Sequence, residues 1–360
     1  LLLPFSTRDA GGGAPLKTLV MNPVIAVDAM GGDHAPGCVV DGCVQAAREY
    51  GLPLLLVGRR QDVEAELGRH DTRGLSIELV HASETVGMGE SPTTALRRKK
   101  DSSIRVGAEL VRNGKAQAFV SAGNTGAVMT TAKVVVGALE GVARPALTAI
   151  VPNLRGRSVW LDVGANVDCR PDHLVQFALM GHLYAREVLG ISRPRVGLLS
   201  IGEEDGKGNE QTREAFKVLK SIDINFQGNC EGRDIFNANM DVIICDGFIG
   251  NVSLKAIESV VEAVEAFLRE EISKSLPARL GFLLSRNAFR NFKKRVDYAE
   301  YGGVPLLGIK GCVIIGHGHS SAKAIKSAVR VARDFTVHKV NDRIHEAIIE
   351  LSKNQQRLAV

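Results

Sequence analysis

Short apolar runs that each end in a small or polar residue recur along the chain, and this pattern limits the fold more than any other feature. Runs of this length between turn residues are typical of strands buried on both faces of a parallel sheet. The segments between them have helical spacing. The sequence therefore predicts an α/β fold, with strands at 24–27, 54–57, 77–80, 118–120, 159–161, 196–199 and 242–245.

Helix starts of a recognisable kind lie between these runs. Ser91 stands before Pro92, and Arg170 before Pro171, so each proline takes the first helical position. The second of these helices is expected to continue through Leu189. The alternation favours a doubly wound α/β/α architecture with a mostly parallel sheet, and the many glycines suit its tight turns.

The length of 360 residues allows one large domain or two lobes. We expect residues 1–20 to be a tail outside the fold and residues 21–354 to form a single catalytic unit. Within it we divide lobe 1 (21–145 plus 310–354) from lobe 2 (146–309), with a cleft between them. A hairpin at 304–309 and 312–315 precedes a long helical stretch from 320 towards 354.

The composition excludes several classes of protein. Hydrophobic residues make up 45% and charged residues 24%, as in ordinary globular enzymes. No apolar run approaches the roughly 18 to 20 residues of a membrane span, and we expect the protein not to be exported, because the first residues show no basic region followed by an apolar run. The 6 cysteines form no CxxC pair and are expected to be reduced and buried in a cytoplasmic protein. A net charge of +5 is modest, and we expect no nucleic-acid partner.

The turn at residues 28–34 brings two acids, two glycines and a histidine together after the first strand. In open α/β sheets, ligands bind beyond the carboxyl ends of the strands. Gly31 and Gly32 would let the backbone approach a ligand closely, while Asp28 and His34 supply charge and proton transfer. The acids could equally cap the helix expected near Pro36, and the residues alone leave both interpretations open.

A second turn, at residues 121–127, follows the strand at 118–120 and opens a helix. Asn124, Thr125 and Gly126 place an amide, a hydroxyl and bare backbone at this helix start. Such a combination can hold an anion. A simple helix cap would need only one of these groups, so both functions stay open.

A third turn, at residues 246–255, places Asp246 at a strand end ahead of two glycines. Asn251 and Lys255 follow four residues apart, on one face of the expected helix. A lysine at this position could bind phosphate as a point charge. It could equally be a solvated surface lysine.

A fourth turn, at residues 315–321, carries His317 and His319 between a strand and a helix. Its glycine spacing resembles a dinucleotide fingerprint, but Ser321 replaces the third glycine and no later strand could supply a ribose-binding acid. No third metal ligand stands at a diagnostic spacing. We therefore expect neither a dinucleotide nor a metal here, and the acidic loop at 199–210 fails the spacing of a nucleotide-binding loop.

Together these stretches closely resemble the bacterial phosphate acyltransferases of phospholipid synthesis. The resemblance runs from residue 24 to about residue 347. It implies a fold similar to phosphotransacetylases and to isocitrate and isopropylmalate dehydrogenases, in a cytoplasmic homodimer without a cofactor. The motifs that carry it are VDAMGGDHAP, SAGNTGA, LDVGANVDC, IGEEDGKGNE, DGFIGNVSLK, YGGVPLLGIKG and GHGHSSAKAI.

The resemblance implies a reaction in which inorganic phosphate attacks the thioester of acyl–acyl carrier protein to give acyl phosphate. Because phosphate is itself the nucleophile, the enzyme needs only to hold a dianion, stabilise an oxyanion and release a thiol. We expect the anion and oxyanion contacts among Gly31, Gly32, Asn124, Thr125, Gly126, Asn251 and Lys255. His34 or His317 could protonate the departing thiolate, and Asp28 or Asp246 could orient that histidine.

Two basic stretches are candidates for partner surfaces. Acyl carrier proteins are acidic, so Arg97, Arg98, Lys99 and Lys100 could form a docking site, or simply a solvated helix face. The stretch 279–295 mixes basic residues with Phe282, Leu283, Phe289, Lys293 and Lys294, and contains no acid. It could contact an anionic membrane peripherally, cap the acyl chain at a dimer edge, or pack its apolar face in a core. Membrane contact would suit delivery of acyl phosphate to a membrane acyltransferase.

Two other functions compete with this prediction. A decarboxylating dehydrogenase on the same fold would need nicotinamide and usually a divalent metal. A non-catalytic adaptor would tether acyl carrier protein to the membrane without turnover. Fold kinship alone does not decide among these functions.

Overall fold

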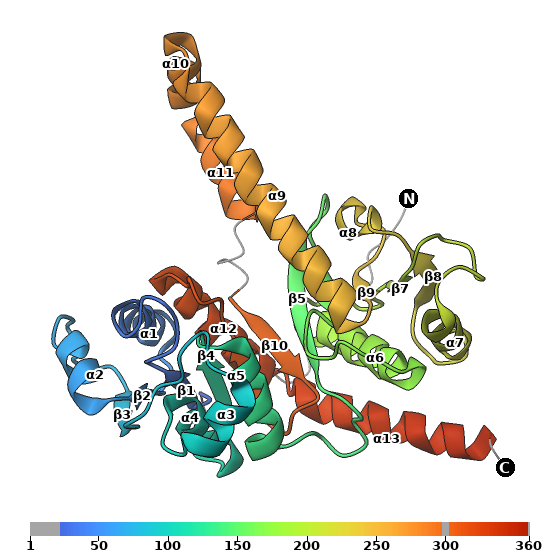
Figure 1. The fold of residues 1–360 in the computed structure, drawn as a ribbon, viewed down its shortest axis with the longest axis horizontal. Helices are drawn as coiled ribbons and strands as arrows, with labels where there is room; N and C mark the ends of the chain where they lie inside the picture. Colours follow the sequence, from blue (N-terminus) through green and yellow to red (C-terminus); the bar gives the residue numbers. More distant parts are fainter. Residues whose placement is uncertain (1–21, 297–301, 359–360) are drawn as a thin grey trace, which may run out of the picture.

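The computed structural model describes residues 22–296 and 302–358, so the predicted tail at 1–20 lies outside the described residues. Strands and helices alternate as the sequence predicts (Figure 1). The strands are β1 (Ile25–Asp28), β2 (Leu54–Gly58), β3 (Ile77–His81), β4 (Ala118–Ser121), β5 (Ala146–Pro152), β6 (Arg157–Leu161), β7 (Val196–Leu199), β8 (Phe226–Cys230), β9 (Val242–Ile244), β10 (Val304–Leu307) and β11 (Cys312–Ile315).

Helices occupy most of the chain between these strands. They are α1 (Gly37–Tyr50), α2 (Arg60–Leu67), α3 (Pro92–Arg98), α4 (Ser103–Arg112), α5 (Thr125–Thr131), the π-helix η1 (Ala132–Val136), α6 (Pro171–Glu187), α7 (Glu210–Leu219), α8 (Asp234–Asn237), α9 (Gly247–Ser273), α10 (Leu276–Leu284), α11 (Arg286–Val296), α12 (Ala322–Val337) and α13 (Val340–Leu358).

All the described strands belong to one sheet of 11 strands in the order β3-β2-β1-β4-β11-β10-β5-β6-β9-β7-β8. In this order, β3, β2, β1, β4 and β11 form one group of parallel strands, and β6, β9, β7 and β8 form another. Between these two groups, β10 is antiparallel to both β11 and β5, and β5 is antiparallel to β6. Three reversals leave the second group running opposite to the first, which decides where each strand-end turn lies.

Apolar side chains fill both faces of the sheet. Ile25 and Val27 point into the layer that α1, α12, α13, α6 and α7 cover, whereas Ala26 between them points into the layer of α4, α5, η1 and part of α9. Successive strand residues face opposite sides, so a strand buried on both faces must be apolar throughout. This confirms the predicted doubly wound architecture with a mostly parallel sheet.

Most predicted elements are confirmed within one or two residues. The hairpin is present as β10 and β11, and the C-terminal stretch divides into α12 and α13. Strands β5 and β8 were not predicted, because Thr148 interrupts the first and Gln227, Gly228 and Asn229 make the second polar. The 6 cysteines are free, and 4 of them are buried. The proposed division into two lobes stays a prediction.

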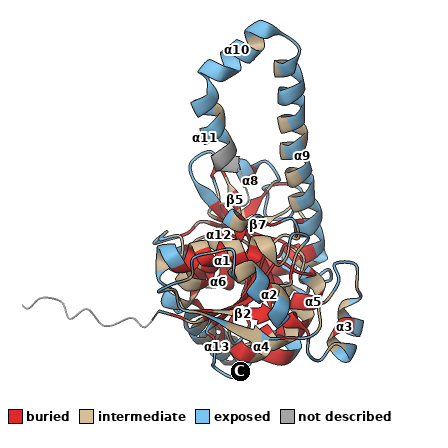
Figure 2. Ribbon diagram, turned by 90° about the vertical axis from the view of Figure 1, so that its left-hand side faces the viewer, coloured by how far each residue is buried: buried red, intermediate tan, exposed pale blue. Residues whose placement is uncertain are grey.

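One segment leaves the layered body altogether. Helix α9 is 27 residues long, and only Gly247 and Gly250 near its start are buried. Its remainder projects outward, α10 crosses its far end and α11 runs back towards the body, so that the three form an arm (Figures 1 and 2). Among the described residues, no helix is long and apolar enough to cross a membrane.

Candidate active site

The turns after β1, β4 and β11 meet at one edge of the sheet. These three strands are neighbours and run in the same direction, so their carboxyl ends must lie together. The backbone N–H of Asp33 donates to the carbonyl of Gly318 over 2.9 Å. Gly32 has φ +104°, a conformation that favours glycine, and a Cβ there would lie 3.0 Å from the same carbonyl oxygen. These three turns therefore lie against one another.

Asp28 lies beneath these turns and holds them together. It is buried, and its carboxylate accepts hydrogen bonds from the Ser121 hydroxyl at 2.7 Å and from the Met30 N–H at 3.1 Å. Burial raises the pKa of Asp28, although these hydrogen bonds oppose the shift. A Cβ on Gly31 would lie 2.5 Å from the same carboxylate, so Gly31 allows this close packing. These contacts favour a positioning role for Asp28.

The Asn124 side chain also forms hydrogen bonds with neighbouring backbone groups. Its amide oxygen caps α5 by accepting from the Ala127 N–H at 3.0 Å. Its amide nitrogen donates to the carbonyls of Met88 at 2.8 Å and Glu90 at 2.9 Å. The side chain thus fixes the loop at 87–90 against the turn after β4, and its predicted contact with an anion stays a prediction.

Thr125 and Gly126 follow at the start of α5. Thr125 is exposed, whereas Asn124 is buried and Gly126 is half-buried. A Cβ on Gly126 would lie 2.7 Å from the ring of Pro92, so glycine lets α5 pack against the start of α3. Of the groups predicted in this turn, the Thr125 hydroxyl has the most open position.

The turn after β11 brings two histidines to the meeting point. His319 Nδ1 lies 2.7 Å from a carboxylate oxygen of Asp33, and the rings of His317 and His319 have their centroids 5.6 Å apart. The contact between Asp33 and His319 was not predicted, because it depends on the sheet bringing distant turns together. His34 is exposed, and its backbone carbonyl accepts from the N–H of Cys38.

The third predicted turn begins at the opposite strand ends of the sheet. Because β9 runs opposite to β11, Asp246 lies at the other edge, where it caps α9 by accepting from the Ile249 N–H at 2.8 Å. The turn after β6 joins it there, since the Gly247 N–H donates to the Asn166 carbonyl at 2.8 Å.

Asp162, which lies in the LDVGANVDC motif but was not predicted as a site residue, organises this second group. Its buried carboxylate accepts from the N–H groups of Leu147 at 2.9 Å, Ala165 at 3.0 Å and Asn166 at 2.7 Å. Burial raises the pKa of Asp162 despite these hydrogen bonds. Like Asp28, Asp162 stands at the end of an apolar run, and this pattern in the sequence could have identified it as a candidate site residue.

Helix α9 connects the two groups of turns. The Asn251 amide donates to the Val163 carbonyl at 3.3 Å, within the second group. One helical turn later, Lys255 Nζ lies 3.4 Å from His317 Nε2 and 2.6 Å from a carboxylate oxygen of Glu258. Two predicted residues from different turns, Lys255 and His317, are thus in contact. We call this contact the Lys255–His317 junction.

The junction has a defined electrostatic character. Burial lowers the pKa of His317, and the positive charge of Lys255 lowers it further, while Glu258 acts in the opposite direction. The imidazole is therefore held neutral near pH 7. A neutral imidazole beside an ammonium group can exchange a proton with a substrate while the cation faces an anion.

The two predicted partner surfaces differ in their surroundings. Arg97, Arg98 and Lys100 are exposed, but Lys99 turns inward and bonds Glu90 at 2.6 Å, so the four do not form a single solvated face. On the arm, Phe282 is 38% and Leu283 62% exposed, and the rings of Phe282 and Phe289 lie 4.8 Å apart. The prediction that the apolar face of this stretch packs in a core is therefore wrong. The side chains of Lys293 and Lys294 lie outside the described residues.

Comparison with solved structures defines the class of fold. The chain is similar to a phosphotransacetylase from Streptococcus pyogenes with a TM-score of 0.60 and 17% identity, over 89% of this chain and 94% of that one. It is also similar to a branched-chain phosphotransacylase from Enterococcus faecalis, with a TM-score of 0.54 and 15% identity over 88% and 99% of the two chains. The chain thus has the fold of the phosphotransacetylases.

Sequence comparison then gives the family. A family model described as "Fatty acid synthesis protein" matches residues 24–343. The chain is 55% identical to the phosphate acyltransferase of Geobacter sulfurreducens, over 89% of this chain and 93% of the relative, and 52% identical to that of Nitratidesulfovibrio vulgaris, over 90% and 94%. The chain belongs to the phosphate acyltransferase family of fatty acid and phospholipid synthesis, and it is an acyltransferase.

Proposed function

We propose that this enzyme transfers a fatty acyl group from acyl–acyl carrier protein to inorganic phosphate and releases acyl phosphate for phospholipid synthesis. The observation that carries the proposal is the Lys255–His317 junction, where an ammonium group and a neutral imidazole lie 3.4 Å apart beside the turns after β1, β4 and β11. Phosphate is a dianion that must lose a proton as it attacks, and these two groups suit those two needs.

The reaction balances without a cofactor. A phosphate oxygen forms a bond to the thioester carbonyl carbon, the C–S bond breaks, and the proton of hydrogen phosphate passes to the thiolate. His317 accepts this proton and returns it to the leaving sulfur, while Lys255 offsets the charge of the phosphate and of the oxyanion. The exposed Thr125 hydroxyl is a further donor for the phosphate. Asn124 and Asp28 hold the turns in place.

The surface beside the junction suits an acyl chain. On α9, Phe248 and Val252 lie seven and three residues before Lys255, so they share its helical face. Both are large apolar side chains in contact with solvent, 59% and 55% exposed respectively. An acyl chain bound along them would cover this surface and place its thioester next to Lys255.

The proposal extends to partners. Arg97, Arg98 and Lys100 offer positive charge to the acidic acyl carrier protein, and we propose that the enzyme works as a cytoplasmic homodimer. The arm, with its exposed apolar and basic residues, would give peripheral contact with an anionic membrane, where a membrane acyltransferase takes the product.

Purified enzyme tests the reaction directly. Thiol release from acyl–acyl carrier protein is expected to require inorganic phosphate, with acyl phosphate as the product. Lys255→Ala should lower kcat/KM about 100- to 1000-fold, as loss of one oxyanion contact does, and Asn251→Ala should lower it less. Lys274→Ala is the matched control, because this lysine caps the far end of α9 and pairs with Glu271. Unchanged phosphate-dependent cleavage in Lys255→Ala would refute the assignment.

A further inference from the structure

A cavity of about 350 Å³ opens at the ends of β6 and β9 that lie away from Asp162 and Asp246. The turn between β5 and β6 forms one wall, and the C-terminal end of α6 forms another. The segments that lead into β7 and β9 complete it. Its volume falls within the range of small-molecule sites. Arg155, Arg157, Arg195, Asp241, Val188 and Ile191 are among the residues that line it.

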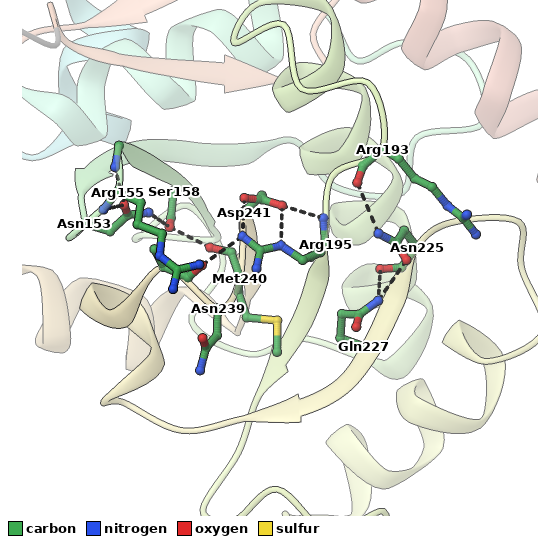
Figure 3. A network of polar contacts seen from close by, with 12 residues as sticks. Asn153, Arg155, Ser158, Arg193, Arg195, Asn225, Gln227, Asn239, Met240 and Asp241 are labelled. Carbon is green, nitrogen blue, oxygen red and sulfur yellow. Dashed lines mark hydrogen bonds and ion pairs between the residues drawn. The ribbon is translucent and has the colours of Figure 1, made fainter.

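The wall that carries Arg155 and Arg157 is held in a fixed shape. The Asn153 side chain accepts from the N–H groups of Arg155 at 2.9 Å and Gly156 at 2.6 Å, and it donates to Ser158 Oγ at 2.8 Å. The Ser158 hydroxyl in turn donates to the Met240 carbonyl at 2.8 Å (Figure 3). The turn is therefore tied to the segment before β9, and its two guanidinium groups approach the cavity from a rigid base.

The third guanidinium group is anchored by an acid. Arg195 forms two hydrogen bonds with the Asp241 carboxylate, from Nε and Nη2 at 2.9 Å each, and Nη2 also donates to the Ala238 carbonyl at 2.8 Å (Figure 3). Burial alone would raise the pKa of Asp241, but the hydrogen bonds and charge of Arg195 lower it. Asp241 is thus ionised and balances one arginine.

Arginines outnumber acids around the cavity. Of the described residues that line it, three are arginines and one is an acid. Val188, Leu189 and Ile191 contribute an apolar wall at the end of α6. Guanidinium groups match phosphate in geometry and charge, and an apolar wall favours a hydrocarbon group.

We propose that this cavity is a second binding site, for a phosphate monoester that carries an alkyl or acyl chain. The phosphate lies against Arg155, Arg157 and Arg195, and the chain lies against Val188 and Ile191. The site is separate from the turn that contains Asp162. Helix α6 begins just after that turn and ends at the cavity, and its 17 residues span about 25 Å.

Titration calorimetry with octyl phosphate tests the proposal. The titration uses the full chain with Lys255→Ala, so that the proposed catalytic anion contact is weakened. We expect saturable binding of one octyl phosphate, with weaker binding of inorganic phosphate and none of octanol. Adding Arg155→Ala and Arg157→Ala should weaken octyl phosphate binding about tenfold or more, because charge-assisted hydrogen bonds are lost.

Arg73→Ala in the same background is the matched control, since Arg73 is an exposed arginine paired with nearby Asp71. Arg155→Ala alone serves if the combined variant does not fold, because Arg155 lies on the exposed turn. Equal binding by the arginine variants and by the control overturns the proposal, and so does binding that octanol matches. Absence of any octyl phosphate binding also overturns it.

Discussion

The cluster of turns after β1, β4 and β11 and the arm of α9, α10 and α11 are built on opposite principles. In the cluster, a Cβ added to Gly31 would lie 2.5 Å from Asp28 and 2.7 Å from the Gly123 nitrogen. In the arm, a Cβ added to Gly281 would meet nothing within 4 Å. The cluster is packed to the limit of atomic contact, whereas the arm exposes nearly all its surface (Figure 2).

This difference indicates where each region can carry function. Backbone in the cluster is fixed by buried side chains, so a substrate can be positioned there with little loss of entropy. Side chains on the arm contribute little to the fold, so they are available for a partner surface. Helix α9 belongs to both regions, because its first turns pack on the sheet and its later turns project from the body.

The largest expected difference in stability comes from adding a single methyl group to a glycine in each region. Gly31→Ala should destabilise the fold by about 1 to 3 kcal/mol, because neither the buried carboxylate nor the backbone of Gly123 can easily move away. Gly281→Ala should instead stabilise the fold by about 0.5 to 1 kcal/mol, because alanine favours a helix over glycine. Urea unfolding of both variants measures the difference. Similar losses in the two variants would contradict the contrast.

The pH dependence of stability tests the buried acid in the cluster. Because burial raises the pKa of Asp28, the folded state holds a proton that the unfolded chain loses above its pKa of 3.8. Stability therefore falls as the pH rises from 3.8 through the raised pKa, by at most about 1.4 kcal/mol per pH unit.

Asp28→Asn removes this titration, so the variant should gain stability relative to the wild type over that pH range. Urea unfolding at a series of pH values gives the comparison. A constant difference between Asp28→Asn and the wild type would show that folding does not raise the pKa of Asp28.

The sequence predicts the cluster well because its signals are local. Apolar strands end at Asp28, Ser121 and Ile315, and glycines follow each of them. Parallel neighbours must then bring these turns together. The detailed contacts could not be predicted in the same way. Asp33 and His319 are far apart in sequence, and only the order of the strands makes them neighbours.

The sequence could not predict the placement of Asp246, since that depends on strand direction. The missed strand β5, together with β10, reverses the second half of the sheet. In a fully parallel sheet, Asp246 would lie at the same strand ends as His317. In the structure, it is Lys255, further along α9, that contacts His317. Apolar patterning reports burial but does not encode the direction of a strand.

A smaller effect is expected at the base of α9, where the two regions join. Lys255→Met removes a positive charge from His317, so the pKa of His317 should rise. It should stay below 6.5, because burial is the larger cause of the lowered value and persists in the variant. NMR titration of the histidine resonances measures this shift. Lys274→Met, at the far end of the helix, should leave it unchanged, and an unshifted His317 in Lys255→Met would contradict the electrostatic link.

The smallest effect on stability is expected at the tip of the arm. Leu284 is 81% exposed, so Leu284→Ser should change the free energy of unfolding by no more than about 0.5 kcal/mol. Its loss of apolar area should nevertheless weaken binding to anionic vesicles, which a sedimentation assay measures. Val134→Ser is the matched control, since Val134 is 62% exposed on the body rather than the arm. If Leu284→Ser unfolds the protein as readily as a core substitution, the arm is packed against a partner in solution, and its apolar surface serves that contact instead of a membrane.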